Sequence, residues 1–169
     1  MGGDRVLVAY YSRTGTTRTV ARAMAERLGC DLEEIEDNVP RKGILGYLRA
    51  GRDAMSGKET SISPAKHDPG DYDLVIVGTP VWGWSLCPAA RTYLARYGDK
   101  IRKAAFFTVS EGTEPKKIVS QMEVVWGNKA TAVVGFLRKE VVSGGFVGKL
   151  DQFLSRLGLP ETRSRDQRT

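Results

Sequence analysis

Apolar runs of strand length recur along this chain. The run at residues 5–11 includes β-branched residues and has no charge after Arg5, which is typical of a strand buried on both faces of a sheet. A shorter, partly polar run at 30–36 predicts a strand at a sheet edge. Further strands are predicted at residues 71–79, 103–109 and 130–137.

Between these strands, apolar residues recur with the spacing of an amphipathic helix. The pattern predicts helices over 16–28 and 146–157, and two more that begin at Pro88 and Pro115. A weaker helical pattern covers 43–55, where two glycines lower the helix propensity. Strands that alternate with helices indicate an α/β fold, in which helices cover both faces of a parallel sheet.

A turn rich in hydroxyl side chains separates the first strand from the first helix. Its residues are Ser12, Arg13, Thr14, Gly15, Thr16 and Thr17. The first N–H groups of a helix have no partner within the helix, and the helix dipole makes that end positive. Hydroxyls, amides and one arginine therefore favour a phosphate monoester as the ligand. A plainer reading makes a threonine the helix N-cap and Gly15 a turn residue.

Two further loops follow predicted strands and carry candidate site residues. The loop after 71–79 contains Pro80, Val81, Trp82, Gly83 and Trp84. Two tryptophans at the end of a central strand suit a flat heteroaromatic ligand, although one of them can instead pack on the neighbouring helix. The loop after 103–109 contains Ser110, Glu111 and Gly112, which alone would suggest a simple turn.

Both loops and the hydroxyl-rich turn resemble the flavodoxin family. The spacing Ser-x-Thr-Gly-x-Thr at 12–17 is similar to the loop that holds the FMN phosphate, and Trp82-Gly83 matches a peptide that borders the flavin ring. The third loop, at 110–112, is similar to the segment that contacts the pyrimidine end of the flavin, but it lacks the tyrosine that covers the ring in many flavodoxins.

The resemblance implies a three-layer flavodoxin-like fold with a five-stranded parallel sheet of order 2-1-3-4-5. The loops after strands one, three and four then meet at the carboxyl edge of the sheet, where such folds bind ligands. We expect residues 1–160 to form a single domain and residues 161–169 to be a polar, disordered tail.

Composition narrows the class of protein without identifying it. The chain has 169 residues, two cysteines, one histidine and a net charge of +6. So few cysteines and histidines predict neither a disulfide framework nor a metal site. There is no apolar run of membrane-spanning length, no signal-peptide core at the start and no nucleic-acid-binding motif. These features lead us to expect a cytoplasmic protein; they leave its oligomeric state open.

Three functions fit this picture. The first is an FMN-binding redox protein that passes electrons to a partner protein or a small-molecule acceptor. The second is an NAD(P)H-dependent FMN quinone oxidoreductase, which the basic composition and the missing tyrosine favour because its substrate needs an open flavin face. The third is a non-enzymatic binding module on the same fold, against which the complete phosphate loop argues. Cys87, close to the predicted flavin, is more simply a residue that precedes a helix-opening proline.

Overall fold

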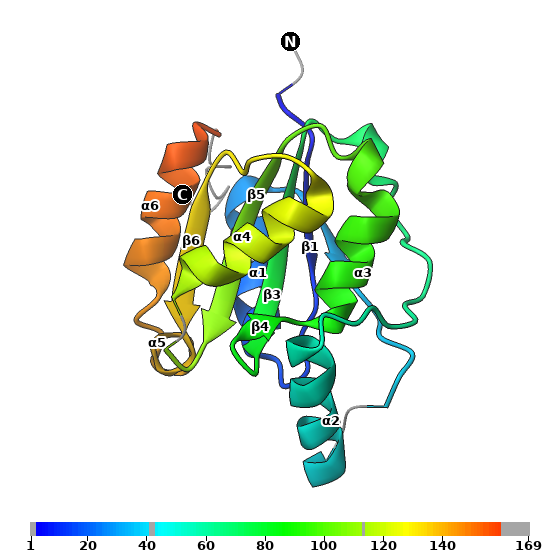
Figure 1. Cartoon of the computed structure of the whole chain (residues 1–169). Coiled ribbons are helices and arrows are strands. Elements are labelled where there is room, and N and C mark those ends of the chain that lie inside the picture. The colour runs from blue at the N-terminus through cyan, green and yellow to red at the C-terminus, as the bar shows by residue number, and fades with distance from the viewer. Residues whose placement is uncertain (1–2, 41–42, 113, 160–169) are drawn as a thin grey trace.

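A parallel sheet forms the centre of the computed structural model, which describes residues 3–40, 43–112 and 114–159 (Figure 1). The strands run in the order β2-β1-β3-β5-β6, which is 2-1-3-4-5 when only parallel strands are numbered. These strands are β1 (Val6–Tyr10), β2 (Asp31–Glu34), β3 (Leu74–Trp82), β5 (Ala104–Ser110) and β6 (Val133–Leu137). The predicted topology is therefore confirmed, whereas the predicted tail at 161–169 lies outside the described residues.

Helices cover both faces of this sheet (Figure 1). α1 (Thr16–Leu28) and α6 (Val147–Leu157) pack on one face through residues such as Met24 and Phe153. α3 (Pro88–Tyr97) and α4 (Pro115–Trp126) pack on the other face through residues such as Tyr93 and Met122. The molecule therefore has three layers, as predicted. None of its described helices is long and apolar enough to cross a membrane.

The uncharged first strand serves both of these cores. Leu7 and Ala9 belong to the core on the α3 side, and Val8 and Tyr10 belong to the core on the α1 side. Because successive side chains of a strand point to opposite faces, a strand between two helix layers has no solvent-facing position for a charge. The sequence pattern of this strand thus follows directly from its central place.

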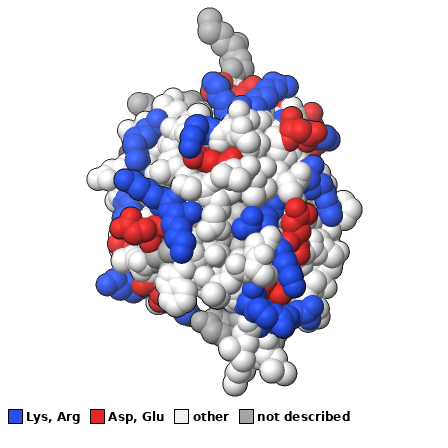
Figure 2. Space-filling view, in the orientation of Figure 1, with Lys and Arg blue, Asp and Glu red and all other residues white. Residues whose placement is uncertain are grey.

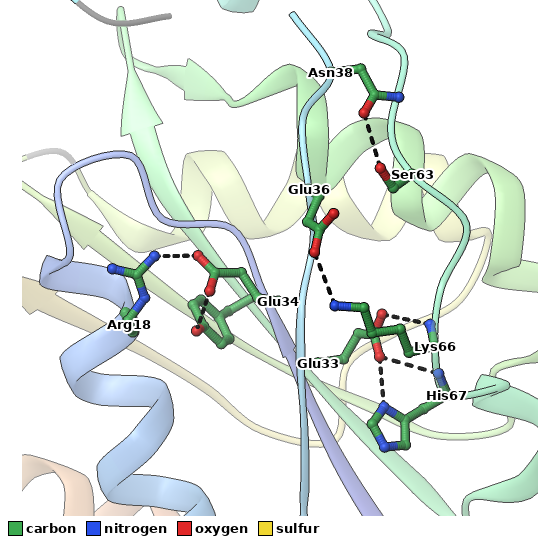
Figure 3. A network of polar contacts seen from close by, with 9 residues as sticks. Arg18, Glu33, Glu34, Glu36, Asn38, Ser63, Lys66 and His67 are labelled. Carbon is green, nitrogen blue, oxygen red and sulfur yellow. Dashed lines mark hydrogen bonds and ion pairs between the residues drawn. The ribbon is translucent and has the colours of Figure 1, made fainter. Parts of the chain in front are cut away.

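The edge strand β2 is held by two neighbouring carboxylates that point to opposite faces (Figure 3). Glu33 is only 4% exposed and accepts hydrogen bonds from the backbone N–H of Lys66, at 2.8 Å, and of His67, at 3.1 Å. The Nδ1 atom of His67 lies 2.6 Å from the same carboxylate. His67 therefore holds its surface turn against the sheet through Glu33. Glu34 instead accepts hydrogen bonds from Tyr10 and Arg18.

Three further elements of the described chain bear on the site, and two of them were not predicted. β4 (Ser85–Leu86) pairs antiparallel with the end of β3, and α5 (Arg138–Ser143) follows β6. Both are too short for their periodicity to be detected in the sequence. α2 (Gly43–Met55), which the weak helical pattern does predict, extends beyond the end of the sheet (Figure 1). The following large apolar residues of α2 stay 62–83% exposed, whereas the small Ala54 is buried: Ile44, Leu45, Leu48 and Met55.

Candidate functional site

A small cavity lies at the carboxyl edge of the sheet, where the segments after β1, β3 and β5 meet. Its volume is about 170 Å³, so it can enclose only part of a cofactor-sized ligand, since such sites typically measure about 300–1,000 Å³. The residues that line it are Arg13, Thr14, Thr16, Thr17, Pro80, Val81, Trp82, Val109, Ser110, Glu111 and Arg138. Nine of these come from the three predicted loops, which the fold thus brings together.

The hydroxyl-rich turn leaves the start of α1 open to a ligand. Gly15 is the N-cap residue, with φ of 97°, and its N–H donates to Ser12 Oγ at 3.1 Å. Neither Thr16 nor Thr17 is the N-cap, and no side chain caps the helix. The plainer reading, in which a threonine serves only to cap the helix, is therefore wrong. The first N–H groups of α1 remain available to an anion, and the helix dipole adds positive potential there.

The side chains around this helix start match the chemistry of a phosphate. Thr17 is buried, and the hydroxyls of Thr14 and Thr16 lie 3.5 Å apart, so three hydroxyl groups line the same cavity. Arg13 adds positive charge to the lining. The positive charge of Arg18 is instead paired with the carboxylate of Glu34, which accepts a hydrogen bond from the Arg18 guanidinium group (Figure 3). Neutral donors and arginine together suit a dianionic monoester.

The segment after β6 supplies a second arginine to the cavity, which the sequence motifs did not indicate. Arg138, the first residue of α5, lines the cavity and donates to Glu111 Oε1 at 3.0 Å. Ser110 is buried, and its Oγ accepts a hydrogen bond from the N–H of Gly112 at 3.2 Å, which shapes the turn. Arg138 could have been predicted as a site residue, because it directly follows the last parallel strand, and that strand ends at the same edge as β1 and β3.

The tryptophan segment is a tight hairpin between β3 and β4, and not an irregular loop. Trp82 pairs with Ser85, so that Gly83 and Trp84 form a two-residue turn with φ of 53° and 57°. Positive φ at both central residues is the signature of a type I′ turn, which normally has asparagine or glycine there. Trp84 adopts this strained conformation while 66% of its surface is exposed. Trp82 instead packs edge-on against Tyr11, with ring centroids 5.4 Å apart.

The β3-β4 hairpin packs against α2. A Cβ atom on Gly83 would lie 2.8 Å from Met55 Cγ and 3.1 Å from the carbonyl oxygen of Gly51. Glycine is thus required here both by its backbone conformation and by the close approach of the helix. Gly83 does not line the small cavity but a second, larger pocket between the hairpin and α2.

A family model described as flavodoxin matches residues 5–132 of this chain. The chain belongs to the flavodoxin family. Among solved structures, this flavodoxin is similar to a flavoprotein from Lactobacillus acidophilus in complex with FMN: 23% identity, TM-score 0.69, covering 88% of this chain and 99% of the other. It is also similar to a flavoprotein from Bacteroides eggerthii: 22% identity, TM-score 0.70, covering 89% and 98%. At these identities the likeness supports the fold.

In this flavodoxin, five of the fourteen predicted site residues lie outside the lining of the small cavity. They are Ser12, Gly15, Gly83, Trp84 and Gly112. Ser12, Gly15 and Gly112 form the turns that shape the cavity, as their hydrogen bonds show. Gly83 and Trp84 form the hairpin turn beside it.

Cys87 lies behind the hairpin and is fully buried. Burial raises the pKa of its thiol to about 11, and Thr79 Oγ1 donates a hydrogen bond to its sulfur at 3.1 Å. A thiol that stays protonated in an apolar environment is a poor nucleophile and a poor ligand. This favours the simpler reading of Cys87 as a packing residue at the start of α3.

Proposed function

We propose that this flavodoxin binds FMN at the carboxyl edge of its sheet, with the phosphate at the start of α1, and that it acts in electron transfer. The single observation that carries the proposal is the uncapped N-terminus of α1, surrounded by three hydroxyls and by Arg13 in one cavity. Family membership supports the same reading. When bound, FMN supplies one- and two-electron redox chemistry, while the protein positions and tunes it.

Each of the three loops has a task in this proposal. The turn at 12–17 holds the phosphate through backbone N–H groups and hydroxyls. Trp82, at the border between the small cavity and the larger pocket, stacks on the flavin ring, and the exposed Trp84 contributes less. Ser110, Glu111 and Gly112 border the pyrimidine end of the ring through their backbone groups.

The decisive test compares FMN with riboflavin, which lacks the phosphate, by flavin fluorescence quenching. The wild type should bind FMN more tightly. The double variant Thr14→Ala, Thr17→Val removes two hydroxyls and nearly preserves the buried volume; it should weaken FMN binding by at least about tenfold and leave riboflavin binding unchanged. Thr19→Ala, on the same helix but outside the cavity, is the matched control. Equal affinity of the wild type for FMN and riboflavin would refute the phosphate assignment.

The roles of the two tryptophans are tested separately. Trp82→Ala should weaken the binding of FMN and of riboflavin alike and should change the visible flavin absorbance, because stacking involves the ring. Trp84→Ala should have a smaller effect on both measurements. A larger effect from Trp84→Ala would reverse the assignment of the two rings.

A second candidate, an NAD(P)H-dependent FMN reductase, is favoured by the open side of the site. The third loop offers only small or polar side chains at 110–112, and arginine and lysine side chains are spread over the face drawn in Figure 2. Steady NADPH consumption by the FMN-loaded protein in the presence of a quinone would support this activity. Reduction of a partner protein without NADPH consumption would support a carrier.

A further inference from the structure

A second pocket lies directly beside the FMN site, between α2 and the β3-β4 hairpin. Its volume is about 600 Å³, which is within the range of small-molecule sites, about 300–1,000 Å³. Its lining consists of Leu48, Gly51, Arg52, Met55, Ser56, Val81, Trp82 and Gly83. Val81 and Trp82 line this pocket as well as the small cavity, so one wall separates the two sites.

The walls of this pocket suit a flat aromatic ring. Leu48 and Met55 present apolar surface from α2, although both are mostly exposed, and Trp82 and Val81 face them from the hairpin. A methionine thioether makes favourable contacts with aromatic rings, and an indole stacks on them. A ligand here would cover apolar surface that the fold itself leaves in water, which is a source of binding free energy.

The lining of the pocket includes the positively charged side chain of Arg52. Arg52 forms an ion pair with Asp53, with a side-chain nitrogen 3.7 Å from the carboxylate. Arg49 Nε lies 3.8 Å from the same carboxylate, so two guanidinium groups share one negative charge. The side chain of Arg52 is 74% exposed at the rim. A ligand that carries an anionic group is therefore favoured over a neutral one by charge complementarity.

We propose that this pocket binds a flat aromatic anion as the small-molecule redox partner of the flavin. The redox role rests on the proposed function, whereas occupation of the pocket by the ring does not. A quinone of this class would take up two electrons from the reduced flavin and two protons, and would leave as the hydroquinone. The shared wall at Trp82 keeps such a ring next to the FMN site.

Binding is measured by isothermal titration calorimetry with two unreactive probes, 2-naphthalenesulfonate and the neutral 2-naphthol, on the FMN-free and the FMN-saturated protein. The wild type should prefer the sulfonate by up to about fivefold, because a single exposed charge pair contributes little more. This preference should shrink at high salt. Arg52→Gln should abolish the preference without weakening the binding of 2-naphthol.

A change in the apolar wall should act on both probes. Leu48→Gln should weaken each by about threefold or more, since it removes apolar contact. Ile44→Gln, on the same helix but outside the lining, is the matched control and should change neither affinity. Equal affinity of the wild type for the two probes, or unchanged binding in Leu48→Gln, would overturn the proposal.

Two further outcomes separate this proposal from the proposed function. Loss of sulfonate binding in the FMN-saturated protein would overturn the pocket, because the flavin ring would then occupy it. FMN uptake is measured independently by fluorescence quenching. A protein that takes up FMN but binds neither probe refutes the pocket alone, and a protein that binds the sulfonate but not FMN refutes the redox role and the proposed function.

Discussion

Replacing Gly83 by alanine tests how tightly α2 is held against the hairpin. Alanine in the left-handed conformation costs roughly 1–2 kcal/mol of folding free energy. The new Cβ would also lie 2.8 Å from Met55 Cγ and 3.1 Å from the Gly51 carbonyl oxygen, and overpacking of this kind costs roughly 1–3 kcal/mol. Because the exposed Met55 side chain can move aside, we expect Gly83→Ala to destabilise the protein by about 2–4 kcal/mol in total.

Gly127→Ala is the matched control for this variant. Gly127 ends α4 with φ of 86°, and a Cβ there would meet no atom within 4 Å, so only the backbone cost of about 1–2 kcal/mol applies. Urea unfolding should show the difference, and thermal midpoints should fall by about 6–12 °C for Gly83→Ala and about 3–6 °C for Gly127→Ala. Adding Met55→Ala to Gly83→Ala should recover part of the loss. If Gly83→Ala costs no more than Gly127→Ala, α2 does not pack on the hairpin as described.

Two other predictions concern the charged groups. Glu33→Gln should lower the free energy of unfolding by about 1–3 kcal/mol, since the buried carboxylate accepts two backbone hydrogen bonds and contacts His67. The control is Glu36→Gln, which removes one partner of an exposed ion pair and should change the free energy of unfolding little. Equal effects of the two substitutions would contradict the role of Glu33. The hydrogen bond from Lys129 lowers the pKa of Glu123, so this group stabilises the fold above its ordinary pKa and loses that contribution as the pH falls through the lowered value. Glu123→Gln should therefore reduce the thermal midpoint at pH 7 but not at pH 2; a reduction of equal size at both would refute this.

Much of the architecture is readable in the sequence because the periodicity of buried residues is a local property. The run at 5–11 has no charge after Arg5, which is typical of a strand that is covered on both faces, and the helical spacing over 16–28 indicates one buried stripe. The turn at 12–17 can likewise be predicted from the sequence, because the end of a strand and the start of a helix fix the direction of its backbone N–H groups. These features predicted the alternation of strands and helices, whereas the sheet order and the meeting of three loops at one edge were expected from the resemblance to flavodoxins.

Other features depend on contacts between segments far apart in the chain. No local pattern relates Glu33 to His67 or Arg138 to Glu111, since each pair meets only when the strands are placed side by side. The β3-β4 hairpin escapes prediction because Gly-Trp is not a usual turn sequence and β4 has only two residues. The apolar spacing of α2 predicted a helix. Only the tertiary structure shows that most of its large apolar side chains stay exposed and that a pocket lies between this helix and Trp82.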